Sequence, residues 1–397
     1  MTGPFKRDFA RDYDLNDPEL NERWDELLQY MHAGCPVARS EVGEGYWVVN
    51  KYEDVKRCAA EWETFSASDG FMVNRPEGLP FFAPGECDPP LQVKLKVALM
   101  PFLRAQTIAS MEPAIRAQAD ALIDSFIEKG QVEAVGQFGN PFPQIAFAVN
   151  VAGMAAGDMP YLLEVFSLSG PSEQRAANFA LGMKKVDEYL AQRRSEAPRN
   201  DIVDALLAFE YPGYDWEGKV GTMSQLVIGG IGTTGYAISG GLHYLATHPL
   251  ARRMLREDPS RIPAAIEEFL RMFPGAPNMG RRVKAEVEIG GVRMAPNDRV
   301  VLSFGAANRD PALCERPDEI DLTRQPTRHF AFGSGNHACI GAPLARLVLK
   351  VAFEQFLARI PDFNVPDGFV PSYETANTRH MVELPLRFQT APETSRK

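Results

Sequence analysis

Apolar residues recur with helical spacing along most of this chain, whereas alternating apolar and polar positions are confined to short segments towards its two ends. A repeat near 3.6 residues indicates amphipathic helices, and a repeat of two indicates half-buried strands. The pattern predicts helices at 17–32, 52–62, 91–103, 106–128, 142–154, 160–168, 172–194, about 221–248, 262–273 and 342–359.

The strand signals are few and short. Val37–Ser40 and Tyr46–Asn50 flank a Gly-Glu-Gly segment and predict a hairpin. Further strands are expected at 286–289, 292–294, 300–303, 373–378 and 382–387. Because the helices outnumber the strands and do not alternate with them, we expect a mainly α fold with small β-sheets, of the α+β class, and not a doubly wound sheet.

Residues 65–87 show no periodicity and are rich in Gly, Pro and Phe. The stretch is longer than an ordinary connection. Long irregular loops within compact domains usually act as lids or binding loops. We therefore expect this loop to border a functional site.

Composition excludes several classes of function. The 397 residues are 45% hydrophobic, enough for a substantial core, and carry a formal charge of −10 with no Lys/Arg block, which argues against nucleic-acid binding. The cysteines are odd in number, widely spaced and without a C-x-x-C pair, which disfavours zinc, an iron–sulfur cluster or a disulfide framework. The N-terminus lacks an apolar signal region, and no apolar window is long enough to span a bilayer. We expect a reduced, cytoplasmic protein with no membrane partner.

The stretch Phe332-Gly-Ser-Gly-Asn-His-Ala-Cys339-Ile-Gly341 places one cysteine in a glycine-rich loop just before a predicted helix. Gly333, Gly335 and Gly341 allow positive φ or a close approach of the backbone to a flat ligand. The dipole of the following helix favours the thiolate of Cys339, and a thiolate can ligate a haem iron. His337 can donate a hydrogen bond to a carboxylate of such a ligand. The alternative is a buried structural cysteine, since free cysteines are commonly buried.

The same loop also fits part of a dinucleotide-binding fingerprint. Gly333-x-Gly335-x-x-Ala338 has the required spacing, and Glu354 follows where that motif has an acidic residue. The fingerprint needs a βαβ unit, however, and Glu354 lies inside a predicted helix. We therefore reject the dinucleotide reading.

A second cluster, Gly229-Gly230-Ile-Gly232-Thr233-Thr234-Gly235, lies inside the apolar helix. Each interior glycine costs about 1 kcal/mol relative to alanine. One explanation is close helix–helix packing. The other is a helix opened to admit a planar cofactor and a diatomic gas, with the Thr233 hydroxyl facing the gas. A third element, Glu268-x-x-Arg271, is an i,i+3 ion pair that by itself is typical of a helix surface.

These three elements, in this order and at these separations, resemble a cytochrome P450, and the resemblance covers nearly the whole chain. The segment from Asp88 to Lys96, with Gln92 within it, and Ile360-Pro-Asp-Phe363 resemble most closely the soluble bacterial camphor-hydroxylase branch. The resemblance implies the P450 fold, with residues 1–397 as a single haem domain that binds haem b.

The resemblance also implies roles for individual residues. Cys339 would be the axial ligand of the haem iron, and Phe332 would shield its sulfur. Glu268 and Arg271 would hold the core beneath the cofactor. The haem propionates and faces would be bound by Gln92, Lys96, Gly229, Gly230, Arg281, Gly333, Gly335, His337 and Gly341. Thr233 would hydrogen-bond dioxygen or the water that protonates it.

Two positions depart from the family pattern. Gly232 stands where Asp or Glu usually precedes the threonine, so the proton must reach oxygen by Thr233 with Thr234, by ordered water or by a polar group of the substrate. Lys96 stands where Arg is usual and lacks its two-pronged hydrogen bonding, so docking of the redox partner is expected to differ.

The substrate pocket is less distinct in the sequence. The resemblance places Phe71, Phe81 and Phe82 of the long loop over the distal side of the haem, although core packing explains aromatic residues equally well. Further candidates for the pocket wall are Gln225, Ile228, Pro277 and Asn278. Pro80 stands near the position of the camphor enzyme's substrate-binding tyrosine, so camphor itself is not expected.

The expected activity is insertion of one oxygen atom of O2 into a small apolar or aromatic substrate. The chain has no flavin or cluster motif, so electrons from NAD(P)H would arrive through a reductase and an iron–sulfur ferredoxin that docks around Lys96, Arg328 and Arg346. Two alternatives remain: a haem-thiolate peroxygenase or another atypical P450 reaction, suggested by Gly232, and a non-catalytic haem-binding sensor.

Overall fold

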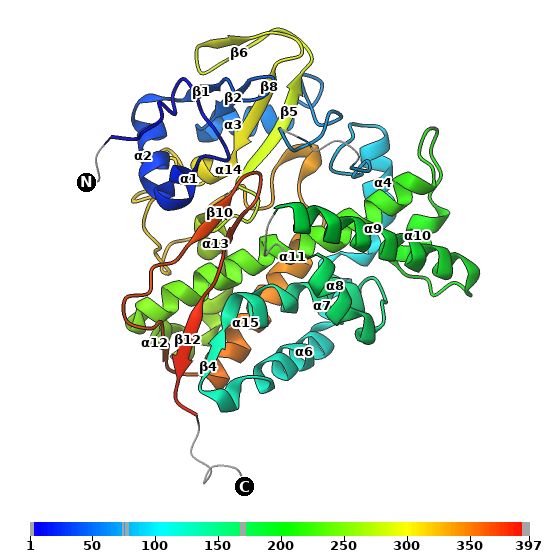
Figure 1. The fold of residues 1–397 in the computed structure, drawn as a ribbon, viewed down its shortest axis with the longest axis vertical. Coiled ribbons are helices and arrows are strands. Elements are labelled where there is room, and N and C mark those ends of the chain that lie inside the picture. Colours follow the sequence, from blue (N-terminus) through cyan, green and yellow to red (C-terminus); the bar gives the residue numbers. More distant parts are fainter. Residues whose placement is uncertain (1–3, 74, 76–78, 167–171, 391–397) are drawn as a thin grey trace.

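A computed structural model of the chain describes residues 4–73, 75, 79–166 and 172–390. Long helices form the larger part of the molecule, and a mixed sheet with the N-terminal helices forms the smaller part (Figure 1). The α-helices are α1 (Pro18–Glu22), α2 (Trp24–Gly34), α3 (Tyr52–Ala60), α4 (Leu91–Leu99), α5 (Ala105–Ala109), α6 (Glu112–Asp124), α7 (Pro141–Asn150), α8 (Met159–Val165), α9 (Ser172–Ser195), α10 (Ile202–Ala208), α11 (Trp216–Thr247), α12 (Pro249–Glu257), α13 (Ile262–Met272), α14 (Phe304–Ala307) and α15 (Ala342–Arg359).

The strands form small sheets, as expected for this class. They are β1 (Val37–Ser40), β2 (Tyr46–Val49), β3 (Phe65–Ser66), β4 (Gln131–Glu133), β5 (Asn278–Val283), β6 (Val287–Ile289), β7 (Val292–Met294), β8 (Arg299–Ser303), β9 (Phe363–Asn364), β10 (Tyr373–Thr375), β11 (Arg379–Met381) and β12 (Pro385–Phe388). The largest sheet has the order β1-β2-β8-β5-β3, in which only β2 and β8 run parallel among the described strands. The mainly α fold with small sheets is therefore confirmed.

Both faces of the five-stranded sheet are covered. Every residue of β8 is buried, and alternate side chains point to opposite faces. Val301 joins the core beneath α1 and α2, whereas Val300 and Leu302 join the core beside α3. This sheet therefore ties the N-terminal segments to the strands that follow α13.

The centre of the helical part is α11, which packs against α7, α13 and α15. Asp215 caps its first turn by accepting a hydrogen bond from the amide of Gly218 at 3.2 Å. The helix ends at Thr247, two residues before Pro249, which begins α12. The apolar composition that predicted this helix is explained by its position in the core.

Two predicted helices are interrupted in the structure, and one predicted strand starts later than expected. The helix expected at 106–128 is broken between α5 and α6, because Pro113 cannot continue a helix and instead occupies the first turn of a new one. The helix expected at 17–32 is divided at Arg23, whose backbone has φ −126° and ψ 31°. The strand expected at 382–387 starts only at Pro385. The end of the helix expected at 160–168 lies outside the described residues.

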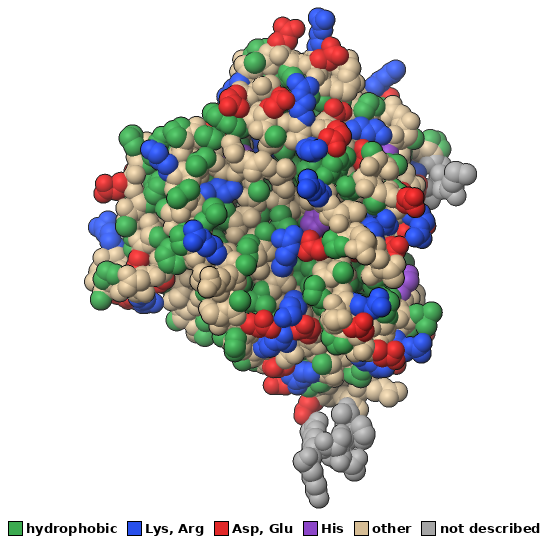
Figure 2. Space-filling view, turned by 180° about the vertical axis from the view of Figure 1, so that it is seen from behind, with side chains coloured by type: hydrophobic (Ala, Val, Ile, Leu, Met, Phe, Trp, Pro, Cys, Tyr) green, Lys and Arg blue, Asp and Glu red, His purple; other side chains and the backbone are tan. Residues whose placement is uncertain are grey.

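The sequence pattern missed α10, α12, α14, β3, β4, β5, β9 and β11. Of these, β5 matters most, because it carries Asn278 and Arg281 and pairs with β8 in the largest sheet. Within the described residues, no helix combines the length and apolar character needed to cross a bilayer. On the face opposite to that of Figure 1, basic and acidic side chains are intermixed (Figure 2).

Candidate haem site

The loop that contains Cys339 is closed by its own backbone hydrogen bonds. The Cys339 amide donates to the carbonyl of Phe332 at 2.8 Å, and the Gly333 amide donates to Phe330 at 2.9 Å. Gly333 and Gly335 have φ of 64° and 63°, as predicted for glycines at these turns. Gly341 has φ −81°, which any residue can adopt, so of the two reasons offered for a glycine there only the close approach to a flat ligand remains.

The Cys339 side chain is exposed, yet the protein around it is dense. Desolvation by this surrounding protein raises the pKa of the thiol, although hydrogen bonds from the amides of Gly341 and Ala342 and the charges of Lys96 and Arg346 act in the opposite direction. The amide hydrogen bonds expected from the start of the following helix are therefore present, but burial has the larger effect on the pKa of the thiol. From a sulfur that is accessible although protein surrounds it closely we infer a recess, called here the cavity at Cys339.

Helix α4 is tied to this loop through Lys96 and Gln92. The Lys96 ammonium donates to the carbonyls of Asn336 at 2.7 Å and Ala338 at 2.6 Å, and the Gln92 side-chain amide also donates to Asn336. Both side chains thus hold the backbone just before Cys339.

Three cationic or potentially cationic groups gather near the loop without an ion-pair partner among the described residues: Lys96, Arg281 and His337. Desolvation is the main cause that lowers the pKa of Arg281 to about 10 and of His337 to about 3, and for His337 the charges of Arg281 and Lys96 add to it. Two buried atoms, Oε1 of Gln92 and Nε2 of His337, have no hydrogen-bond partner. Buried polar groups require partners, and Nε2 of His337, as a donor, together with the Arg281 guanidinium suits an anion with several oxygens, whereas Oε1 of Gln92 is an acceptor and needs a donor. The two carboxylates of haem b meet that requirement.

The glycines of α11 divide into two groups. An ideal Cβ at Gly235 would lie 2.3 Å from Oδ1 of Asn140, so this glycine permits close packing with the neighbouring segment. At Gly229 a Cβ would meet nothing within 4 Å, and at Gly230 its nearest neighbour, Cβ of Phe147, is 3.8 Å away. The packing explanation thus applies to Gly235, whereas Gly229 and Gly230 leave open space beside the helix.

The expectation of an opened helix is wrong, because α11 is a continuous α-helix through residues 229–235. The Thr233 hydroxyl donates to the carbonyl of Gly229 at 2.6 Å, one turn earlier. Thr234 is buried, and Gly232, directly before Thr233, has no side chain that could carry a proton. The open space beside Gly229 comes from missing side chains and needs no break in the backbone.

The Glu268–Arg271 pair is buried, so the surface alternative is wrong. Both guanidinium–carboxylate hydrogen bonds are 2.8 Å, and Arg271 also donates to the carbonyls of Asn308 and Glu319. Arg324 adds a second cation to Glu268 at 3.1 Å. Desolvation would raise the pKa of Glu268, but its bonds with Arg271 and the other donors hold it below its ordinary value.

Of the pocket candidates, Phe71 and Phe82 belong to one aromatic row. Their ring centres are 6.4 Å apart, and Phe82 lies 6.2 Å from Phe179 of α9. Phe81 is 37% exposed, and Pro277 and Asn278 are buried. Ile228 and Gln225 are half-buried on α11, and Gln225 contacts Gly85 of the long loop.

Sequence reasoning missed the residues that hold the long loop in place. Arg75 forms a two-pronged ion pair with Glu86, with both distances 3.0 Å, and Glu86 is buried. Asn377 donates from one amide nitrogen to the carbonyls of Phe71 at 3.1 Å and Asn278 at 3.2 Å. Opposite charges at Arg75 and Glu86, within one loop rich in Gly, Pro and Phe, were a signal for the first pair. No local signal marked Asn377.

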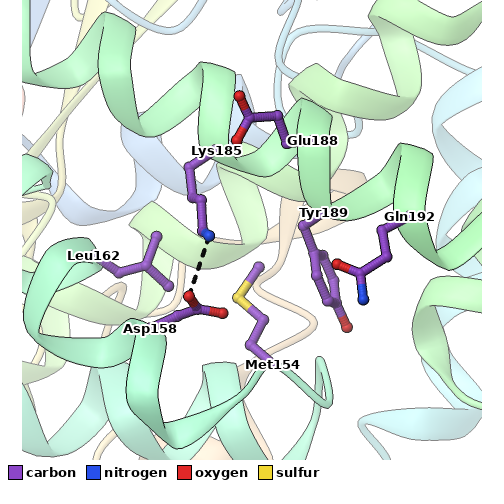
Figure 3. A pocket seen from close by; sticks show the side chains of 7 residues that line it. All are labelled: Met154, Asp158, Leu162, Lys185, Glu188, Tyr189 and Gln192. Atoms are coloured by element: carbon purple, nitrogen blue, oxygen red, sulfur yellow. Dashed lines mark ion pairs between the residues drawn. The ribbon is translucent and has the colours of Figure 1, made fainter.

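A separate pocket lies on α8 and α9 (Figure 3). Its wall includes Met154, Leu162 and Tyr189, and an ion pair of 3.1 Å joins Lys185 to Asp158 beside it. None of the predicted site residues lines this pocket, so it is distinct from the cavity at Cys339.

Comparisons with known proteins agree with this geometry. Residues 154–365 match the family model of cytochrome P450. The steroid C26-monooxygenase of Mycobacterium tuberculosis is 30% identical, over 96% of this chain and 98% of that protein. The structure of cytochrome P450 CYP109Q5 from Chondromyces apiculatus superposes with a TM-score of 0.85 at 30% identity, covering 96% of this chain and 99% of that chain.

The solved cytochrome P450 CYP101C1 is 25% identical, with a TM-score of 0.84 over 96% of this chain and 98% of that chain. The expected resemblance to bacterial P450s, with the camphor-type CYP101 group among the neighbours, is thereby confirmed. The sequence match, the P450 fold and a cysteine loop that fits haem b lead to one conclusion: this chain belongs to the cytochrome P450 family of haem-containing monooxygenases.

Proposed function

We propose that this protein inserts one oxygen atom of O2 into a small apolar or aromatic substrate, with Cys339 as the axial ligand of the haem iron. The observation that carries the proposal is the Cys339 thiol, which is accessible although protein surrounds it closely and which the amides of Gly341 and Ala342 approach. Haem b, when bound, supplies the chemistry that activates O2. The steroid C26-monooxygenase, a relative whose named substrate is largely apolar, supports an apolar substrate here.

The role of the chain around the sulfur is electrostatic. Amide hydrogen bonds and nearby cations stabilise a thiolate more than a thiol. Arg346 lies 4.6 Å from the Phe332 ring centre, so the aromatic ring and the guanidinium together cover one side of the loop. Phe332 would thereby keep water from the sulfur.

Gln92, Arg281 and His337 would bind the haem propionates. The charge of Arg281 and the unpartnered Nε2 of His337 support this role, whereas the Gln92 amide nitrogen already donates to Asn336. A charge-assisted hydrogen bond to a propionate would then stabilise the buried Arg281 guanidinium. Lys96 already donates to two carbonyls, so in this proposal it mainly orders the loop beside Cys339.

Thr233 would handle protons at the cavity face of α11. Its hydroxyl hydrogen bonds to Gly229, so its lone pairs are free to accept a hydrogen bond from a water or from the substrate. Gly232 supplies no acid, so ordered water, Thr234 or a polar substrate group completes the path. This same departure favours a second candidate, a peroxygenase that needs no separate proton delivery to O2.

Electrons would come from NAD(P)H through a reductase and an acidic ferredoxin, and the protein would act in the cytoplasm. The docking surface would centre on Lys96, Arg328 and Arg346. Arg328 is exposed, whereas Arg346 is bound to Glu267 at 2.7 Å. Arg328 is thus the member of this group best able to meet an acidic partner.

The decisive experiment is the absorption of the reduced, haem-loaded protein under carbon monoxide. We expect the strongly red-shifted Soret band of thiolate coordination, and its loss in Cys339→Ser. Absence of that band from intact wild-type protein would refute the proposal. Turnover driven by ferredoxin with tight coupling to NADH, and little turnover with peroxide, would reject the peroxygenase.

A further inference from the structure

Gln225 lies on the same face of α11 as Gly229 and Thr233, because residues four and eight positions apart in a helix share one face. Gly229 opens onto empty space, and Thr233 carries the hydroxyl proposed to manage protons. Gln225 therefore brings a polar side chain to the same cavity-facing row, two turns before Thr233.

The orientation of its amide is set by the long loop. The Gly85 amide donates to Oε1 of Gln225 at 3.2 Å. A backbone N–H can bond only to an acceptor, so the oxygen must face Gly85 and the nitrogen must take the other position. If residue 85 had a side chain, its Cβ would lie 2.1 Å from Nε2 of Gln225. The absence of a side chain at Gly85 therefore lets the Gln225 amide lie directly against the loop backbone.

The loop segment that holds Gln225 is itself well anchored. Glu86, next to Gly85, accepts a hydrogen bond from the Phe82 amide at 3.0 Å and is paired with Arg75. The carbonyl of Phe81 lies against Gly221, one turn before Gln225. The amide is thus held in one orientation before any ligand arrives, which reduces the entropy lost on binding.

The amide nitrogen of Gln225 has no acceptor among the described residues, and it is not one of their fully buried polar atoms. It therefore keeps accessible surface. Gln144 shows the contrast, since both its amide atoms are buried and unpartnered. An apolar ligand that covered Nε2 without offering an acceptor would leave a donor unpaired, which is unfavourable.

We propose that Gln225 is a specificity-determining residue that donates Nε2–H to an oxygen acceptor, such as a ketone carbonyl, on an otherwise apolar substrate. This inference rests on the proposed function. Eight residues of helix separate Gln225 from Thr233, a rise of about 12 Å. The acceptor therefore lies at the end of the substrate remote from the carbon that is oxidised.

The test compares ligands that differ only in the acceptor. Bicyclic and tricyclic ketones, each paired with the hydrocarbon of the same skeleton, are titrated into the haem-loaded protein and followed by the shift of its Soret band. We expect the ketone to bind about three- to tenfold more tightly than its hydrocarbon.

Three variants test whether the Nε2–H of Gln225 causes the preference for the ketone. Gln225→Met removes the donor, and the ketone preference should fall to about one. Gln225→Glu keeps an oxygen for the Gly85 amide but removes the N–H, so the hydrocarbon should now bind more tightly than the ketone. Gln144→Met changes a glutamine of α7 whose amide atoms are both buried, so it should retain the wild-type preference.

An equal affinity of ketone and hydrocarbon in the wild type, or an unchanged ratio in Gln225→Glu, would overturn the inference. The carbon monoxide spectrum of each protein separates this failure from failure of the proposed function. A normal thiolate band with an unchanged ratio refutes only the role of Gln225.

Discussion

The Thr233 hydroxyl donates its hydrogen to the carbonyl oxygen of Gly229 at 2.6 Å. Gly229 has open space where a side chain would be, so the two residues border the same part of the cavity. With its hydrogen engaged, the hydroxyl can accept a hydrogen bond from a water or ligand. We propose that this geometry lets Thr233 handle protons in a helix that has Gly232, and no acid, before the threonine.

Thr233→Ala should uncouple oxygen consumption from product formation. Loss of a positioned hydroxyl removes a proton-transfer contribution, so product per O2 should fall by about tenfold or more, with release of peroxide. Thr233→Ser keeps the hydroxyl and should retain most of the coupling. Product, O2 and peroxide are measured together; equal coupling in the alanine variant would show that Thr233 does not manage protons.

Gly275→Ala should destabilise the protein and disturb Thr233. A Cβ at Gly275 would lie 2.2 Å from Cα of Thr233, and backbone cannot move aside as a flexible side chain can. We expect a loss of about 1–3 kcal/mol in the free energy of unfolding. Gly229→Ala has room for its methyl group and should instead stabilise the apoprotein by up to about 1 kcal/mol. Denaturant titration checks both, and equal effects of the two variants would contradict the packing argument.

Breaking the Glu268–Arg271 pair should be severe. Arg271 is fully buried, so removing Glu268 leaves a guanidinium without its carboxylate at a cost of about 3–5 kcal/mol. Arg316 and Glu319 form a matched control, because they are also three residues apart, 2.9 Å from each other, but exposed. We expect Glu268→Gln to lower the urea midpoint strongly and Glu319→Gln to change it by less than about 1 kcal/mol.

Stability at acidic pH should depend on Glu267. Desolvation would raise the pKa of this carboxyl, but hydrogen bonds with Arg346 and His329 outweigh it and lower the pKa to about 2. An acid with a lowered folded-state pKa stabilises the protein above its unfolded pKa, and this contribution is lost as the pH falls through the folded value.

As the pH falls from about 4.5 to 2, the free energy of unfolding of the wild type should therefore decrease by about 2 kcal/mol more than that of Glu267→Gln, which lacks the titrating carboxyl. Thermal unfolding across this range measures the difference, with the exposed Glu257→Gln as control. Parallel pH profiles for wild type and Glu267→Gln would contradict the role of the pair.

Arg328→Gln should slow reduction by an acidic ferredoxin about tenfold at low salt and weaken the salt dependence of that rate. Arg328 is exposed, so its loss should leave the fold and chemical reduction by dithionite unchanged. Arg293→Gln, on the separate β6–β7 hairpin, is a control of equal charge. Stopped-flow reduction rates that are the same in both variants would remove Arg328 from the docking surface.

Local sequence signals predicted the elements nearest to the cysteine with accuracy. The helix expected at 342–359 matches α15, because Pro343 suits the first turn and Pro361 prevents continuation past Arg359. The positive φ of Gly333 and Gly335 also followed from residue type alone. The interrupted helices show the limit of this approach, since the break at Arg23 has no proline or glycine to mark it.

The sequence alone determined the fold class, the cysteine loop and the likeness to P450s, because these depend on local spacing and residue chemistry. Only the tertiary structure decided that Glu268 and Arg271 are buried and that Lys96, Arg281 and His337 gather beside the loop. It also brought Gly85 to Gln225, which lies 140 residues away along the chain. Such contacts depend on how helices and strands pack, and periodicity along one segment carries no information about its partner in space.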